Sequence, residues 1–226
     1  MSRQGFSIFL KPYSAVYIDI AKVASSSLKA TFASVLGIDM NQVGGNPHEV
    51  EFPRPPESSR AGPGGRLYPG LYTFAFVRNP WDRLVSCYRD KIQGEVEDFT
   101  QFSQSGVARC LARFDVFSVN MSFEEFVYAV ASIPDADADE HFRSQHKFLT
   151  NDRGGIAVDF VGRYENLEAD FRYVAERIGL PKGISLPRLQ ANPRSVRYMD
   201  YYTAPTRDVV ATRFAQDIAL FSHHFG

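Results

Sequence analysis

The feature that most constrains the fold is a repeated pattern: a short apolar run followed at once by a helical stripe of apolar residues. Residues 15–20 (AVYIDI) are apolar and rich in β-branched side chains, as expected of a strand. The helical stripe after them comprises Leu28, Phe32, Val35 and Leu36. Residues 71–77 (LYTFAFV) are almost continuously apolar, which is typical of a buried strand in a parallel sheet. The sequence therefore predicts two strand–turn–helix units of an α/β domain.

Both helices have start or stop signals. Asn79 is a favourable N-cap and Pro80 a favourable first residue for the second helix. Its apolar face comprises Trp81, Leu84, Val85, Tyr88 and Ile92. For the first helix, we expect Ser25 or Ser26 to be the cap and Gly37 to mark the end.

The rest of the chain predicts further strands and helices. Residues 156–164 (IAVDFVGRY) predict a third strand, and the sequence directly after them predicts a helix. A single final helix is predicted near the end of the chain. Residues 98–150 are expected to be mainly helical, most clearly at 122–132. Residues 38–70 hold most of the Pro and Gly and predict an irregular acceptor-side loop or lid. The whole predicts one domain, residues 1–226, with a central parallel sheet flanked by helices.

Composition excludes several classes of protein. The net charge is −1, so no overall basic field recruits nucleic acid or an anionic membrane. The two cysteines, Cys87 and Cys110, form neither a disulfide framework nor a metal-ligand spacing. The first twenty residues have no long apolar core and no cleavage site, so we expect no membrane anchor and a cytoplasmic location.

The first turn, residues 21–27 (AKVASSS), has the chemistry of an anion site. A helix N-terminus offers unpaired N–H groups and the positive end of the helix dipole. Lys22 adds a charge and three serines add hydroxyl donors. The turn is not a Walker A loop, because GxxxxGK[ST] is absent. The simpler explanation is an ordinary serine cap beside a solvent-exposed lysine.

The second turn carries Arg78 at the end of the buried strand and Ser86 off the apolar stripe of the following helix. Arg78 can bind a phosphate through two N–H groups, and Ser86 can donate one further hydrogen bond. The simpler explanation is that Arg78 pairs with Asp82 and that Ser86 is merely exposed.

Together, two anion sites at the ends of parallel strands indicate a ligand with two separated phosphate-type groups. A 3′-phosphorylated, 5′-activated adenosine nucleotide has this form, whereas the charges of ATP lie in one line. No paired acidic residues mark a magnesium site, so we expect no metal.

At this point the sequence resembles a known family. Residues 22–29 (KVASSSLK) resemble the 5′-phosphosulfate loop of sulfotransferases that use 3′-phosphoadenosine 5′-phosphosulfate (PAPS). Residues 76–91 (FVRNPWDRLVSCYRDK) are similar to the 3′-phosphate segment of the carbohydrate, or Golgi-type family 2, branch. Later segments at 140–142 and 159–167 and the tail at 201–221 are also similar to that branch.

The sequence departs from the family pattern in two ways. Ala21 stands where the family usually has proline. The membrane anchor and paired cysteines of the Golgi-resident members are missing, which implies a prokaryotic-type soluble member.

The resemblance implies a P-loop-NTPase-like sulfotransferase fold and transfer of a sulfuryl group from PAPS to an acceptor hydroxyl, which releases 3′,5′-ADP. A carbohydrate or glycoconjugate acceptor is implied by the branch. The residues implied in donor binding are Lys22, Val23, Ala24, Ser25, Ser26, Ser27, Arg78, Ser86 and, in a late basic loop, Arg194. Lys22 would also stabilise the negative charge on the leaving phosphate.

The acceptor hydroxyl needs a general base, for which histidine is well suited. His48, in the irregular loop between the two turns, is our first expectation. His141, which follows an acidic run, is the second, and Glu49 stays open. Two other functions remain as alternatives: an ATP-dependent kinase acting on a small molecule, and a catalytically inactive nucleotide-binding protein.

Overall fold

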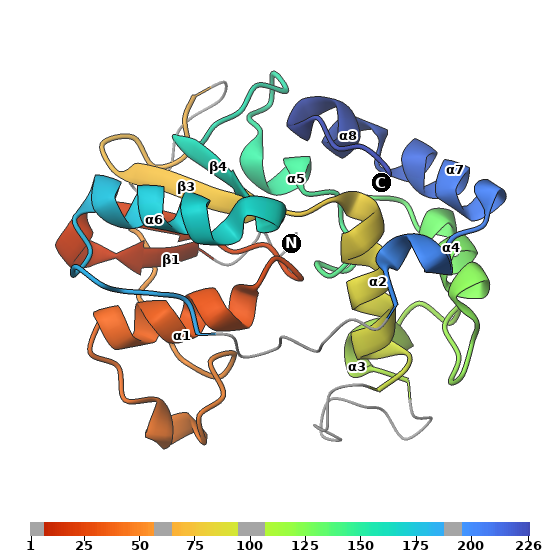
Figure 1. The fold of residues 1–226 in the computed structure, drawn as a ribbon, viewed down its shortest axis with the longest axis horizontal. Helices are drawn as coiled ribbons and strands as arrows, with labels where there is room; N and C mark the ends of the chain where they lie inside the picture. The colour runs from red at the N-terminus through yellow and green to blue at the C-terminus, as the bar shows by residue number, and fades with distance from the viewer. Residues whose placement is uncertain (1–6, 57–64, 95–106, 188–195) are drawn as a thin grey trace. The chain divides into compact units, whose positions relative to one another are not determined.

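The computed structural model describes residues 7–56, 65–94, 107–187 and 196–226 (Figure 1). The chain divides into two compact units, each with its own core. The first unit comprises Met1–Val77 and Lys147–Pro193, and the second comprises Arg78–His146 and Arg194–Gly226. The single domain expected from the sequence stays a prediction.

The first unit contains a four-stranded mixed sheet in the order β1-β2-β3-β4 (Figure 1). Its strands are β1 (Ser7–Leu10), β2 (Ala15–Ile18), β3 (Tyr72–Val77) and β4 (Phe160–Arg163). The pairs β2–β3 and β3–β4 are parallel, as predicted, whereas β1 runs antiparallel to β2. The sequence analysis did not predict β1, because four residues are too short a run to show a period. The α/β class is confirmed, with a mixed sheet in place of a fully parallel one.

Two helices of the first unit pack on one face of this sheet. They are α1 (Ser25–Val35) and α6 (Leu167–Ile178). The Phe32 ring of α1 lies 5.2 Å from the ring of Tyr17 on β2. The Tyr173 ring of α6 lies 4.8 Å from that of Phe160 on β4. Because Tyr17 and Phe160 both pair in register with Phe74 of β3, all three side chains point to the same face.

Gly162 shows how tightly this face is packed. A Cβ atom at this position would lie 2.5 Å from a ring carbon of Phe76 and 3.1 Å from the Cβ of Asp170 on α6. Only glycine therefore lets α6 approach β4 this closely.

The second unit is helical: α2 (Pro80–Lys91), α3 (Arg109–Ala112), α4 (Phe123–Ser132), α7 (Ala204–Arg213) and α8 (Ala215–Phe221). A short helix, α5 (His146–Leu149), begins at its last residue before the chain returns to the first unit. Asn79 caps α2 and Pro80 begins it, as predicted. Ser122 and Glu125 form a capping box at α4. The single final helix that we expected is divided into α7 and α8 at Phe214.

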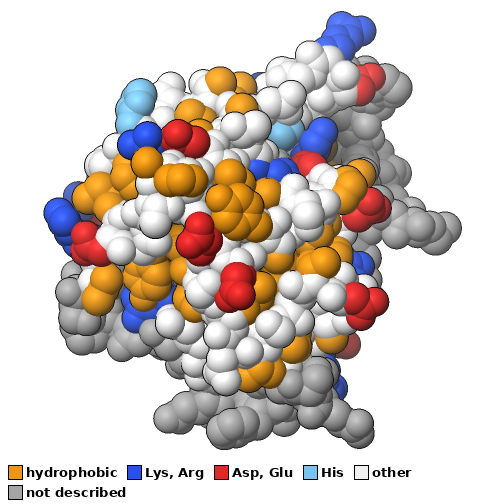
Figure 2. All heavy atoms as spheres, turned by 90° about the vertical axis from the view of Figure 1, so that its right-hand side faces the viewer, with side chains coloured by type: hydrophobic (Ala, Val, Ile, Leu, Met, Phe, Trp, Pro, Cys, Tyr) orange, Lys and Arg blue, Asp and Glu red, His pale blue; other side chains and the backbone are white. Residues whose placement is uncertain are grey.

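The predicted irregular loop is described over residues 38–56 and 65–70, and the one regular piece in these residues is a short 3₁₀ helix, Met40–Val43. The view in Figure 2 shows charged side chains of both signs scattered among hydrophobic ones, in keeping with the net charge of −1. Within the described residues, no helix has the length and apolar character needed to cross a membrane.

Candidate functional site

The loop before α1 has an unusual backbone. Lys22 and Ala24 both adopt left-handed conformations, with φ of 69° and 63°. Such conformations cost about 1–3 kcal/mol each for residues other than glycine and cluster at functional sites. Ala24 is the N-cap of α1, and no side chain caps the helix. The prediction of a serine cap was therefore wrong, because the nearest serine hydroxyl has another partner.

That partner is Asp19, just after β2. One carboxylate oxygen accepts hydrogen bonds from Ser25 Oγ at 2.7 Å and from Tyr17 OH at 3.2 Å. The other oxygen lies 2.7 Å from Nζ of Lys29 on α1, and both charged side chains are largely buried. Burial first, and then the charge of Asp19, raises the pKa of Tyr17, so its hydroxyl stays protonated and donates. Asp19 thus fixes one side of the first helical turn.

His48 completes this group. Its Nε2 lies 2.7 Å from Ser26 Oγ, and its Nδ1 lies 3.4 Å from Lys29 Nζ. The ring is exposed, but its neighbours Pro47 and Val50 are buried. The backbone N–H of His48 also donates to Asn46 Oδ1 at 3.0 Å. The first unit therefore brings the predicted base to the predicted phosphosulfate loop.

Two side chains of α1 contact the His48 ring. The Ser26 hydroxyl can donate to a ring nitrogen or accept from one, so its contact with Nε2 suits either tautomer of the ring. With the proton on Nδ1, Ser26 donates to Nε2, and Nε2 is then the nitrogen that can accept a proton. The contact between Nδ1 and Lys29 is longer, at 3.4 Å.

The other predicted loop residues differ in what they can offer. Val23 is completely buried, so only its backbone can reach a ligand. Lys22 and Ser27 are half-buried, and the carbonyl of Ser27 accepts a hydrogen bond from Thr31. Glu49, the open alternative for the base, accepts a hydrogen bond from Asn46 Nδ2 at 3.2 Å.

In the second unit, Arg78 is 3% exposed and its Nε donates to Asp82 Oδ2 at 2.8 Å. The pairing that we considered as the simpler explanation is thus present. The backbone of Arg78 is held as well, because the side-chain amide of Gln145 accepts from its N–H at 2.9 Å and donates to its carbonyl at 2.8 Å.

Gln145 is in turn fixed by Asp217 of α8, which is fully buried. The Asp217 carboxylate accepts from the backbone N–H groups of Gln145 and His146 at 2.7 and 2.8 Å, and lies 2.7 Å from His146 Nδ1. Sequence analysis missed Gln145, because nothing in the local pattern links it to a residue so distant along the chain.

Three predicted residues remain: Ser86, His141 and Arg194. Ser86 is half-buried on α2. Arg194 lies outside the described residues. His141 is held by Asp139, whose Oδ1 lies 2.5 Å from its Nδ1. Each part of the predicted nucleotide site is thus described within its own unit: the loop before α1 and His48 in the first, Arg78, Ser86 and His141 in the second.

Comparisons with known proteins agree with these segments. The Sulfotransferase family matches residues 7–223. Carbohydrate sulfotransferase 14 of Danio rerio is 30% identical over 164 residues, which make up 67% of this chain and 44% of that protein. The human protein of the same name is 31% identical over 163 residues, 67% of this chain and 42% of its own. An uncharacterized protein of Archaeoglobus fulgidus is 34% identical over 123 residues, 54% of this chain and 80% of its own.

The chain spans less than half the length of the curated carbohydrate sulfotransferases that it matches. No solved structure gives a significant match. The archaeal relative fits the prokaryotic type predicted from the sequence. Because the family match covers nearly all of it, and because the turns before α1 and α2 carry the residues expected of it, this chain belongs to the Sulfotransferase family.

Proposed function

We propose that the protein transfers a sulfuryl group from PAPS to a hydroxyl of an acceptor and releases 3′,5′-ADP. The observation that carries this proposal is the position of His48, whose Nε2 lies 2.7 Å from Ser26 in the first turn of α1, directly after the strained loop. A carbohydrate acceptor is supported by the names of the relatives, which are carbohydrate sulfotransferases.

In the proposed reaction, the acceptor oxygen attacks sulfur and forms a new S–O bond. The S–O bond to the 5′-phosphate breaks, and its electron pair stays on the phosphate oxygen. The acceptor proton goes to His48. The acceptor hydroxyl takes the place of Ser26 at Nε2 and donates its proton to this nitrogen.

Charge develops on the leaving phosphate, so donors in the loop before α1 lower the barrier. Lys22 supplies a positive charge there, and the first N–H groups of α1 supply hydrogen bonds. Asp19 and Lys29 act one step away, because they fix the first turn of the helix and the environment of the base.

We assign the 3′-phosphate to Arg78 in the turn before α2 and to Ser86 on α2, with Arg194 as a further contact. Asp82 orients the guanidinium of Arg78. The side chain of Gln145 holds the backbone of the same residue. A pre-oriented guanidinium loses less entropy when it binds a phosphate.

The direct test is a transfer assay with sulfur-labelled PAPS and a panel of hydroxyl acceptors that includes carbohydrates. We expect His48→Ala to lower kcat by about 100-fold or more, as is typical for loss of a general base. His224→Ala is the matched control, since this histidine side chain is exposed and should leave kcat unchanged.

His141→Ala and Glu49→Gln test the two other candidates in the same assay. If His48→Ala keeps normal turnover while either of these abolishes it, the assignment of the base is wrong. If no acceptor is sulfated and the protein instead transfers phosphate from ATP, the proposed reaction itself is wrong.

A further inference from the structure

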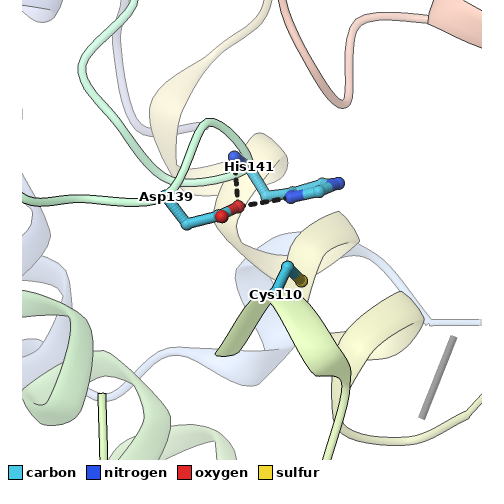
Figure 3. A group of neighbouring side chains, drawn as sticks. All are labelled: Cys110, Asp139 and His141. Atoms are coloured by element: carbon cyan, nitrogen blue, oxygen red, sulfur yellow. Dashed lines mark hydrogen bonds and ion pairs between the residues drawn. The ribbon is translucent and has the colours of Figure 1, made fainter. Parts of the chain in front are cut away.

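We infer that Cys110, Asp139 and His141 form a binding site for a divalent metal ion of the zinc type (Figure 3). The three side chains belong to the second unit: Cys110 lies on α3, and the other two lie on the segment after α4. This inference goes beyond the proposed sulfuryl transfer and is independent of it.

The first observation is the set of donor atoms. A sulfur, a carboxylate oxygen and a ring nitrogen, one from each residue, all lie within 4.8 Å of one another. Sulfur and imidazole nitrogen are the ligands that Zn²⁺ binds most often in proteins, and a carboxylate oxygen is the third common type. Three protein ligands, with a water molecule in the fourth position, make a tetrahedral zinc site. A Mg²⁺ or Ca²⁺ site would instead consist of oxygen atoms.

The second observation is that the ligands are held in place by their neighbours. Leu111, which follows Cys110, is completely buried. Ala138 precedes Asp139 and Phe142 follows His141, and both are at most 1% exposed. Little rearrangement is therefore open to the backbone that carries the three ligands, which favours binding.

Two arginines fix the same segment. The guanidinium of Arg83 on α2 donates to the carbonyls of Glu140 and Arg143, both at 2.8 Å, on either side of His141. The side chain of Arg143 donates to the carbonyl of Ala138 at 2.6 Å. Such support around the ligands is what a preformed metal site requires.

The third observation is the state of the ligands themselves. Asp139 Oδ1 accepts from the backbone N–H of His141 at 3.1 Å and lies 2.5 Å from its Nδ1. Among the described residues, none forms a hydrogen bond with Nε2 of this ring. The ion takes a ring nitrogen of His141, a carboxylate oxygen and the sulfur of Cys110, and the thiol proton is released to solvent. Arg113, 4.0 Å from Asp139 Oδ2, is a weak competitor because its side chain is 59% exposed.

The effect of the ion is to join α3 to the segment after α4. Cys110 is far in the sequence from Asp139 and His141, and the three have no C-x-x-C or H-x-x-x-H spacing, which is why the sequence led us to expect no metal. Only the fold brings them together.

The experiment uses untagged, metal-free protein titrated with Co²⁺ and then with Zn²⁺. A bound Co²⁺ with a thiolate ligand gives a sulfur-to-cobalt charge-transfer absorption band, which adventitious binding to carboxylates or histidines lacks. We expect this band to saturate at one Co²⁺ per chain and to disappear when Zn²⁺ replaces the cobalt.

Three variants test the ligands. Cys110→Ala should abolish the band, and Asp139→Asn and His141→Gln should weaken Zn²⁺ binding by about 10-fold or more, measured by competition with a chromogenic chelator. Glu140→Gln is the matched control, because it removes an exposed acidic side chain from the same segment and should leave the affinity unchanged. Thermal melting without metal shows whether each variant is folded.

The inference is overturned if the wild-type protein shows no charge-transfer band, or if Cys110→Ala binds Co²⁺ with the same spectrum and stoichiometry. Since the first of these results needs no variant, a folding defect in Cys110→Ala would not leave the inference untested.

Discussion

At the residue scale, the central group is Asp19, Lys29 and His48. The sequence suggested His48 as the base from the chemistry that a transfer reaction needs, but it assigned no role to Asp19 or Lys29. A signal was present, since Ser25 and Lys29 are four residues apart and so share one face of α1. The sequence pattern does not show which residue these two side chains bind. Their contacts with Asp19 follow only from the packing of α1 beside the end of β2.

Lys29 should stabilise the first turn of α1 through its ion pair with Asp19. Both side chains are largely buried, so Lys29→Met leaves the carboxylate of Asp19 without this cationic partner. We expect the free energy of unfolding to fall by about 1–3 kcal/mol, measured by urea denaturation.

The control for this change is Lys182→Met, which removes an exposed lysine outside the group. The free energy of unfolding should change by less than about 0.5 kcal/mol in that variant. Equal stability of Lys29→Met and the wild type would contradict the assigned role of Lys29.

At the element scale, the sequence predicted the helix and strand cores better than their connections. The N-cap Asn79 was readable because capping uses residues close in sequence. The cap of α1 was not, because Ser25 bonds to Asp19, a residue outside the helix. The division between α7 and α8 was missed for a related reason: the apolar spacing continues across Phe214, which is buried.

Asp135 links the end of α4 to α7 and should make stability depend on pH. Burial alone would raise the pKa of this carboxyl. The hydrogen bonds from Ser144 N and Oγ and the ion pair with Arg213 outweigh burial, so the pKa is lowered. A carboxyl with a lowered folded-state pKa adds stability above its unfolded pKa of about 4, and this is lost as the pH falls through the folded-state pKa.

We therefore expect Asp135→Asn to lower the free energy of unfolding by about 1–3 kcal/mol at pH 7, measured by urea denaturation. The difference from wild type should shrink as the pH falls below about 4. Asp137→Asn, an exposed neighbour, should change stability by less than about 0.5 kcal/mol. A difference that stays constant down to pH 2 would show that the charge of Asp135 is not what stabilises the fold.

At the scale of the whole molecule, the alternation of strands and helices was enough to predict the α/β class, and the two turns were enough to suggest a nucleotide with two separated anionic groups. The edge strand β1 was missed because its four residues are too short a run to show a period. The hydrogen bonds from Gln145 to Arg78 were not predictable because they join segments that are distant along the chain. Local patterns report which face a residue occupies, and they leave its partner open.

The measurement that tests the central claim most directly is the thermal stability of the protein with 3′,5′-ADP, compared with ATP, ADP and AMP. A ligand at about 100 times its Kd stabilises the folded state by about 2.7 kcal/mol. We expect this increment with 3′,5′-ADP, and expect it to fall in Lys22→Ala and Ser86→Ala, each compared with its own ligand-free melting temperature. Stabilisation by ATP without any by 3′,5′-ADP would contradict the proposed donor and favour a kinase.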